Sequence, residues 1–349
     1  MRATGKKARI FFNPMTENSI SSDRNRADAL IREGRYEEAI EIYRRLTEAR
    51  PEEDSHLLAL AWALHDSGRP EEAAGCFERL FEKELARRLF TGFAYDELVR
   101  IYREGKEWES LISVCERAAD VQPEDAGLLR TLGEACLAAG KAERALHVFE
   151  RLTALEPDSP DHWCSLGDAW LVASDPGNAD VAYLRAAEIE PADAPVFFSR
   201  LAVGCLRAGH LEKARAAFAR CLAARPAEPI FWMGLGDVLI RMGEPEAAVD
   251  AYGRAASLNP ATAGSCYYRL GNLLTREDFH PLASEAFTKA IAAEPENPRF
   301  LLRLAASYTA RNLVDLAAAA LSRVEALTGG TSGKLTPGEK MASHRHRRP

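Results

Sequence analysis

The chain has 349 residues, more than one globular core usually organises, and 47% of them are hydrophobic, which excludes a wholly disordered chain. Runs of β-branched residues are scarce, which argues against strands. The net charge is −7, and because residues 1–22 and 330–349 are basic, the body between them is acidic, so we expect no nucleic-acid partner.

At the N-terminus, residues 1–19 hold four basic residues and an apolar run of only Ile10, Phe11 and Phe12. That run is shorter than the apolar core of a signal peptide, and we expect these residues to form a flexible segment. No stretch of the sequence reaches the roughly 20 apolar residues that a membrane span needs. The seven cysteines are odd in number and form no CxxC pair, which favours a reducing compartment. We therefore predict a cytoplasmic protein without a membrane span.

From residue 20 onward, one pattern returns about every 34 residues. Its best-formed copy is WMGLGDVLIRMGEPEAAVDAYGRAASLNP, residues 232–260. Apolar residues three and four apart predict two helices, and the GEP tripeptide predicts a turn between them. A hairpin with two apolar faces cannot bury both alone, so it must stack on copies of itself. The prolines that end the copies are Pro123, Pro157, Pro191, Pro226, Pro260 and Pro295.

The pattern resembles the tetratricopeptide repeat, in which small and aromatic residues recur at fixed positions. The residues that carry the resemblance are Trp163, Leu166, Gly167, Trp170, Ala179, Tyr183, Ala186 and Pro191, and Trp232, Leu235, Gly236, Leu239, Ala248, Tyr252, Ala255 and Pro260. The resemblance implies an all-α fold, a right-handed α-solenoid of about nine helical hairpins over residues 20–331. The expected units are 20–53, 54–91, 92–125, 126–159, 160–194, 195–228, 229–263, 264–297 and 298–331, followed by a disordered basic tail, 332–349.

Two parts of the array depart from the pattern. In the second unit Leu85 stands where proline is expected, so the segment FERLFEKELARRLF, residues 77–90, is predicted to be one unbroken helix about a turn too long. We expect a change of geometry there, dividing the first two units from the rest. In the last unit, the helix VDLAAAALSRVEAL has alanine on more than one face. Either alanine serves there simply as a good helix former, or this exposed C-terminal end self-associates with a second copy.

The residues that could carry chemistry are scattered along the chain. Four cysteines fall on inward positions of the repeat, namely Cys115, Cys136, Cys205 and Cys221. Cys164 and Cys266 fall on positions that we expect to be less buried, but neither has a histidine at a useful spacing. The array contains no HxxxH or HxH set and no glycine-rich phosphate loop. We therefore predict no catalytic residue, no cofactor, no metal site and no enzyme activity.

The predicted function depends on the repeat surface. The resemblance implies that the first helix of each hairpin lines a concave groove, which repeat positions 2, 5, 9, 12 and 13 face. The predicted partner-binding residues are Glu134, Asp168, Asp237 and Asn272 at position 9, Leu171, Leu206 and Ile240 at position 12, and Arg207, Arg241 and Arg276 at position 13. Acidic and basic rows beside an apolar strip predict a peptide ligand of mixed charge. The residues of the two-carboxylate clamp, by which some family members bind chaperone C-termini, are missing.

These features favour a non-catalytic protein–protein interaction scaffold or adaptor that binds a peptide or protein segment in its groove. The alternative is a regulatory or substrate-recruiting arm for a separately encoded enzyme, such as a glycosyltransferase or a cell-envelope assembly factor. A related helical-hairpin repeat binds RNA, but its units are basic, whereas the body of this chain is acidic.

Overall fold

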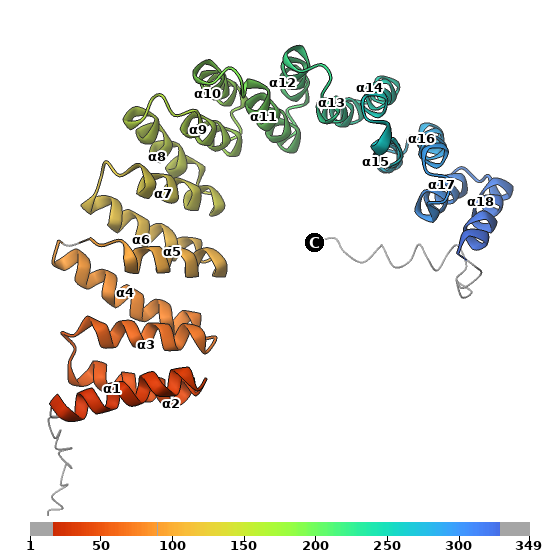
Figure 1. Cartoon of the computed structure of the whole chain (residues 1–349). Coiled ribbons are helices and arrows are strands. Elements are labelled where there is room, and N and C mark those ends of the chain that lie inside the picture. Colours follow the sequence, from red (N-terminus) through yellow and green to blue (C-terminus); the bar gives the residue numbers. More distant parts are fainter. Residues whose placement is uncertain (1–16, 89, 329–349) are drawn as a thin grey trace, which may run out of the picture. The chain divides into compact units, whose positions relative to one another are not determined.

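The computed structural model describes residues 17–88 and 90–328 (Figure 1). Over these residues the chain forms eighteen α-helices, one short 3₁₀ helix and no strand. The α-helices follow one another in nine pairs, each pair packed as a hairpin. The predicted all-α fold of about nine hairpins is confirmed. The predicted basic tail lies outside the described residues, and so does most of the predicted N-terminal segment, although α1 already begins at Glu17.

Contacts divide the chain into two compact units, residues 1–157 and 158–349. This division falls between the fourth and fifth hairpins, not after the second, where the irregular segment suggested it. The helices of the first unit are α1 (Glu17–Arg32), α2 (Tyr36–Ala49), α3 (Asp54–Asp66), α4 (Pro70–Ala86), α5 (Phe93–Gly105), α6 (Trp108–Val121), α7 (Ala126–Ala138) and α8 (Ala142–Leu155).

The second unit contains five hairpins. Its helices are α9 (Pro160–Val172), α10 (Pro176–Ile189), α11 (Ala194–Ala208), α12 (Leu211–Ala224), α13 (Pro229–Met242), α14 (Pro245–Leu258), α15 (Ala263–Arg276), α16 (His280–Ala293), α17 (Pro298–Ala310) and α18 (Val314–Leu327), with the 3₁₀ helix η1 (Pro260–Thr262) before α15. Proline begins several of these helices, where its missing amide hydrogen costs no hydrogen bond and its fixed φ suits the first turn.

Each hairpin turn contains one residue in the left-handed conformation, which ends the first helix and reverses the chain. Glycine adopts this conformation without steric cost, and other residues occupy it in four of the turns. The nine residues are Gly34, Gly68, Lys106, Gly140, Ser174, Gly209, Gly243, Asp278 and Asn312.

The irregular second hairpin is only partly as expected. Helix α4 has 17 residues, longer than its neighbours, but it ends at Ala86 and does not continue to Phe90. Arg88 adopts a φ of 53° and Gly92 a φ of 82°, so the chain leaves the helix and turns before α5 begins. The prediction of one unbroken helix over residues 77–90 was therefore wrong at its C-terminal end.

Glycine and an aromatic ring hold the two helices of a hairpin close together. A Cβ atom at Gly236 would lie 2.5 Å from Cδ2 of Tyr252, nearer than real Cβ contacts allow. Equivalent pairs are Gly133 with Phe149, Gly167 with Tyr183, and Gly271 with Phe287. In the sixth hairpin, Phe218 lies instead against Gly234 of the next hairpin. The two glycines of the sequence WMGLG thus each accommodate a different ring.

Candidate partner-binding surface

The first helices of the second unit pack in series. Helix α9 contacts α11, α11 contacts α13, and α13 contacts α15. Residues at one repeat position on these helices therefore form a row, with one side chain contributed by each hairpin. The predicted partner-binding residues from Asp168 to Arg276 belong to these rows.

The two aspartates of the predicted acidic row are occupied by partners within the chain. Asp168 accepts a hydrogen bond from the Tyr183 hydroxyl and forms an ion pair with Arg200. The tyrosine comes from the second helix of the same hairpin, and the arginine comes from the first helix of the next hairpin. The side chain of Asp168 is 30% exposed. This carboxylate is therefore a structural connection between hairpins, and the prediction that it faces a cationic ligand group needs correction.

Asp237 repeats this arrangement two hairpins later. Its carboxylate accepts hydrogen bonds from the hydroxyl of Tyr252 and from Arg269, and its side chain is only 14% exposed. The Arg269 Nε atom also donates to the Tyr252 hydroxyl oxygen at 3.1 Å, which closes a three-residue network. Burial is the largest cause that raises the pKa of Tyr252, followed by the charge of Asp237. The hydroxyl therefore stays protonated and remains a donor to the carboxylate.

Two other hairpins of the second unit, the sixth and the eighth, show why the acidic row is discontinuous. In the sixth hairpin, position 9 is Val203 and the aromatic residue fifteen positions later is Phe218. In the eighth hairpin, position 9 is Asn272 and the aromatic residue fifteen positions later is Phe287. Phenylalanine has no hydroxyl to donate to a carboxylate. The Asn272 side-chain amide donates to the backbone carbonyl of Tyr268 at 2.9 Å, within its own helix. Aspartate thus occurs where a tyrosine can bind it, which was a signal available in the sequence.

The basic row differs from the acidic row because its charges are exposed. Arg207, Arg241 and Arg276 are all exposed, one on each of α11, α13 and α15. The Arg241 guanidinium donates to the backbone carbonyl of Leu206. The side chains of Arg207 and Arg276 form no hydrogen bond or ion pair with any other residue that the structure describes. Of the charges at positions 9 and 13 in this unit, the arginines are the ones available to a ligand.

The predicted apolar strip is largely covered by the fold. Ile240 is 2% exposed and belongs to the buried core, so its prediction as a contact residue was wrong. Leu171 and Leu206 are half-buried against the neighbouring core cluster, and Leu171 packs on Gly204 of the next hairpin. The exposed apolar side chains at positions 9 and 13 are instead Val172 on α9 and Val203 on α11.

Glu134 lies in the first unit, on α7. Its side chain is exposed and forms an ion pair of 3.1 Å with Arg103 of the preceding hairpin. An exposed pair of this kind contributes little to stability. Glu134 is therefore partnered, as Asp168 and Asp237 are.

Cysteine chemistry is restricted by burial. All seven thiols are free and buried, including Cys164 and Cys266, which the sequence placed on less buried positions. Burial raises the pKa of Cys164 to about 12 and that of Cys266 to about 11. Both residues pack within the hydrophobic core clusters, and the Cys266 thiol donates to the Tyr252 carbonyl at 3.7 Å. The expectation of exposure was wrong, and these thiols are not poised as nucleophiles.

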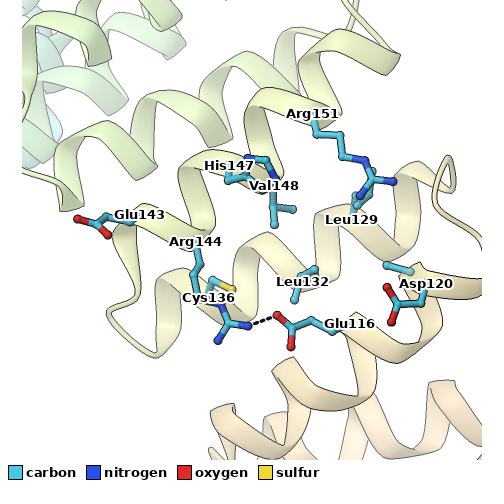
Figure 2. Close-up of a pocket in the computed structure, with 11 residues that line it drawn as sticks. Glu116, Asp120, Leu129, Leu132, Cys136, Glu143, Arg144, His147, Val148 and Arg151 are labelled. Atoms are coloured by element: carbon cyan, nitrogen blue, oxygen red, sulfur yellow. Dashed lines mark hydrogen bonds and ion pairs between the residues drawn. The ribbon is translucent and has the colours of Figure 1, made fainter.

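A pocket that the sequence did not reveal lies in the first unit. It has a volume of about 550 Å³ and lies among α6, α7 and α8 (Figure 2). Leu129, Leu132 and Val148 provide apolar surface, and Arg151 and His147 lie at its edge. Across residues 17–88 and 90–328, no group of three or more His, Cys, Asp or Glu residues could hold a metal ion. None of the described helices is long and apolar enough to cross a membrane.

Comparison with known proteins identifies the repeat. One profile described as a tetratricopeptide repeat matches residues 24–83, 201–263 and 268–330, more than half of the chain. Two further profiles of the same description match residues 126–169 and 94–127. Human protein O-mannosyl-transferase TMTC1 is 25% identical over 164 residues, which cover 45% of this chain and 18% of that protein. This chain thus spans less than a fifth of that relative's length.

Solved structures with a similar fold include a tetratricopeptide repeat protein from Parabacteroides merdae, at 15% identity and a TM-score of 0.47, covering 76% of this chain and 98% of that chain. MamA from Desulfovibrio magneticus matches at 24% identity and a TM-score of 0.36, covering 49% of this chain and 96% of that chain. The family profiles fall on the helical hairpins described above and together account for most of them. This chain belongs to the tetratricopeptide repeat family.

Proposed function

We propose that the chain binds a segment of another protein on the first-helix surface of α9, α11, α13 and α15. Its tetratricopeptide repeats make the chain a protein-interaction scaffold. The family resemblance implies that this surface is the concave one. We further propose that the chain itself catalyses no reaction and acts in the cytoplasm.

One observation supports a particular ligand chemistry. The aspartates of this surface, Asp168 and Asp237, are paired within the chain, whereas Arg207 and Arg276 have no partner among the described residues. A ligand would therefore meet positive charge rather than alternating charge. The bound segment would present carboxylates to the arginine row and apolar side chains to Val172 and Val203. This replaces the ligand of mixed charge that the sequence suggested.

The test is a double charge reversal, Arg207→Glu with Arg276→Glu. A matched control is Lys213→Glu, which reverses an exposed charge on α12, the second helix of the sixth hairpin. Both proteins should unfold within about 0.5 kcal/mol of the parent, because exposed charges contribute little to stability. Affinity purification from the native cell should lose its partner with the double variant and keep it with the control. Equal recovery by both proteins would place the binding surface elsewhere.

The second candidate is an arm that recruits substrate to, or regulates, a separately encoded enzyme. The similarity to TMTC1, a protein named as a transferase, favours it, although the match covers 18% of that protein. In this case the partner recovered by the parent and lost by the double variant would itself be an enzyme. A partner without enzyme activity would favour the plain scaffold.

A further inference from the structure

An aromatic residue capped by a basic side chain recurs in the second unit. The aromatic residue lies near the start of a first helix, and the basic residue follows 22 positions later on the second helix of the same hairpin. The pairs, with the distance from the cation to the ring centroid, are Arg220 over Phe198 at 5.3 Å, Arg254 over Trp232 at 4.9 Å, and Lys289 over Tyr267 at 5.6 Å. A cation is attracted to the face of an aromatic ring, so each pair holds the two helices of its hairpin together.

The fourth hairpin keeps the basic residue and lacks the ring. Leu129 stands at the aromatic position on α7, and Arg151 stands 22 residues later on α8. This hairpin contains the pocket of about 550 Å³, and both residues line it (Figure 2). Leu129 is 1% exposed, so its smaller side chain lies beneath the space that a ring would fill. The pocket thus lies beside the position that an aromatic side chain occupies in the three hairpins of the second unit.

A hydrogen-bond acceptor is also present. In the seventh hairpin the indole nitrogen of Trp232 donates to the Pro226 carbonyl at 2.8 Å. The residue at the same repeat position before α7 is Pro123, and its carbonyl accepts a hydrogen bond from Arg151. Arg151 therefore makes the contact that an indole makes elsewhere in the chain. An indole entering the pocket would take over this carbonyl, and the freed guanidinium would lie over its ring.

The charges around the pocket indicate which residues would lie next to the aromatic residue in a bound ligand. Glu116 is neutralised by its ion pair with Arg144. Asp120 on α6 and Glu143 on α8 have no ion-pair partner among the described residues, and they lie on opposite sides of the pocket (Figure 2). Unpaired carboxylates at both sides favour a ligand with basic groups next to its aromatic residue.

We propose that the pocket among α6, α7 and α8 is a second docking site, independent of the arginine row. Its occupant is an aromatic side chain, tryptophan above all, from a partner protein's segment in which lysine or arginine flanks the aromatic residue. The three capped aromatic residues of the second unit show the geometry that this side chain adopts. The apolar floor of Leu129, Leu132 and Val148 covers the ring, and Arg151 caps it.

The experiment titrates the full chain into the peptide acetyl-Lys-(5-fluoro-Trp)-Lys-amide and follows its ¹⁹F NMR signal. We expect saturable broadening that acetyl-Lys-Trp-Lys-amide reverses and acetyl-Lys-Leu-Lys-amide does not. Leu129→Trp supplies the ring from within the chain and should weaken peptide binding at least tenfold. Arg151→Gln removes the capping cation and should weaken binding about 2–5-fold, the range that corresponds to estimates for exposed cation–π pairs.

Several results would overturn the proposal. The first is a folded Leu129→Trp protein that binds the peptide with the same affinity as the parent. The second is a leucine peptide that displaces the fluorinated peptide as effectively as the tryptophan peptide does. The third is a parent protein that does not bind the fluorinated peptide. If Leu129→Trp does not fold, the surface variants Arg151→Gln and Asp120→Asn decide, and unchanged affinity in both refutes the site. Tighter binding by the Phe11→Ala, Phe12→Ala chain would make the chain's own N-terminal segment the occupant and would also refute a partner.

Discussion

Replacing Gly236 with alanine tests whether close approach of the two helices determines the repeat pattern. The new Cβ atom would lie 2.5 Å from Cδ2 and 2.7 Å from Cε2 of Tyr252. The ring cannot easily move away, because Tyr252 is fully buried and its hydroxyl is bonded to Asp237 and Arg269. Helix α13 must therefore shift away from α14.

Two opposing effects set the magnitude. Alanine favours a helix interior over glycine by about 1 kcal/mol. Forcing an extra carbon into a packed interface costs about 1–3 kcal/mol, and the fixed ring places this site toward the upper end. The free energy of unfolding should therefore fall by roughly 1–2 kcal/mol.

Gly253→Ala is the matched control, because Gly253 lies in α14 of the same hairpin. A Cβ atom there would meet only the Tyr267 hydroxyl, at 4.0 Å. This change keeps the helix-propensity gain without the clash and should stabilise the chain by up to about 1 kcal/mol. We would follow urea unfolding by the circular dichroism of the helices. The urea concentration at the midpoint should be highest for Gly253→Ala, intermediate for the parent and lowest for Gly236→Ala. A midpoint of Gly236→Ala at or above that of the parent would refute the packing argument.

Three further predictions concern the thiols, a helix cap and the C-terminal end. The native chain should resist alkylation by iodoacetamide at pH 8, since its seven thiols are buried, and mass spectrometry showing rapid labelling of Cys164 or Cys266 would contradict their placement. The pKa of Asp175 is held below its ordinary value by hydrogen bonds from backbone amides. The amide of Asn178 has the larger effect, and the amide of Gly177 adds to it. This cap therefore stabilises α10 above the unfolded-state pKa of about 4, and the stabilisation is lost as the pH falls through the lower folded-state pKa. The stability difference between the parent and Asp175→Ala should narrow in acid urea titrations, and a constant difference would exclude the cap. Deleting residues 330–349 should leave the melting temperature unchanged. Deleting residues 315–349 should lower it, because α18 packs on α17. Equal melting temperatures for the two deletions would show that α18 does not stabilise the array.

The hairpins could be predicted because their determinants are local. A glycine or alanine, an aromatic residue and a proline at fixed spacing specify two helices and their turn within about 34 residues. The end of α4 could not be predicted in this way. Without a proline near residue 85, nothing in the local sequence opposed a longer helix, and the left-handed conformation of Arg88 is not a property of arginine itself.

The site could be predicted less well from the sequence, because the residues that determine it are distant along the chain. The resemblance placed Asp168 and Asp237 on a ligand-facing row, but Arg200 and Arg269, which pair with them, lie 32 residues away on the next hairpin. Ile240 was predicted to be exposed from its repeat position, yet neighbouring hairpins cover it. Contacts between hairpins, together with the tyrosine fifteen positions later in the same hairpin, decide which of these side chains reaches solvent.

The most direct test of the proposed scaffold function is photo-crosslinking in the native cell. A benzophenone side chain would be placed at Val203, an exposed position on α11 one helical turn before Arg207, and at Ala216, an exposed position on α12. If the first-helix surface binds a protein segment, Val203 should give a discrete crosslinked partner that disappears with Arg207→Glu and Arg276→Glu, and Ala216 should not. A partner crosslinked from Ala216 and absent from Val203 would contradict the account.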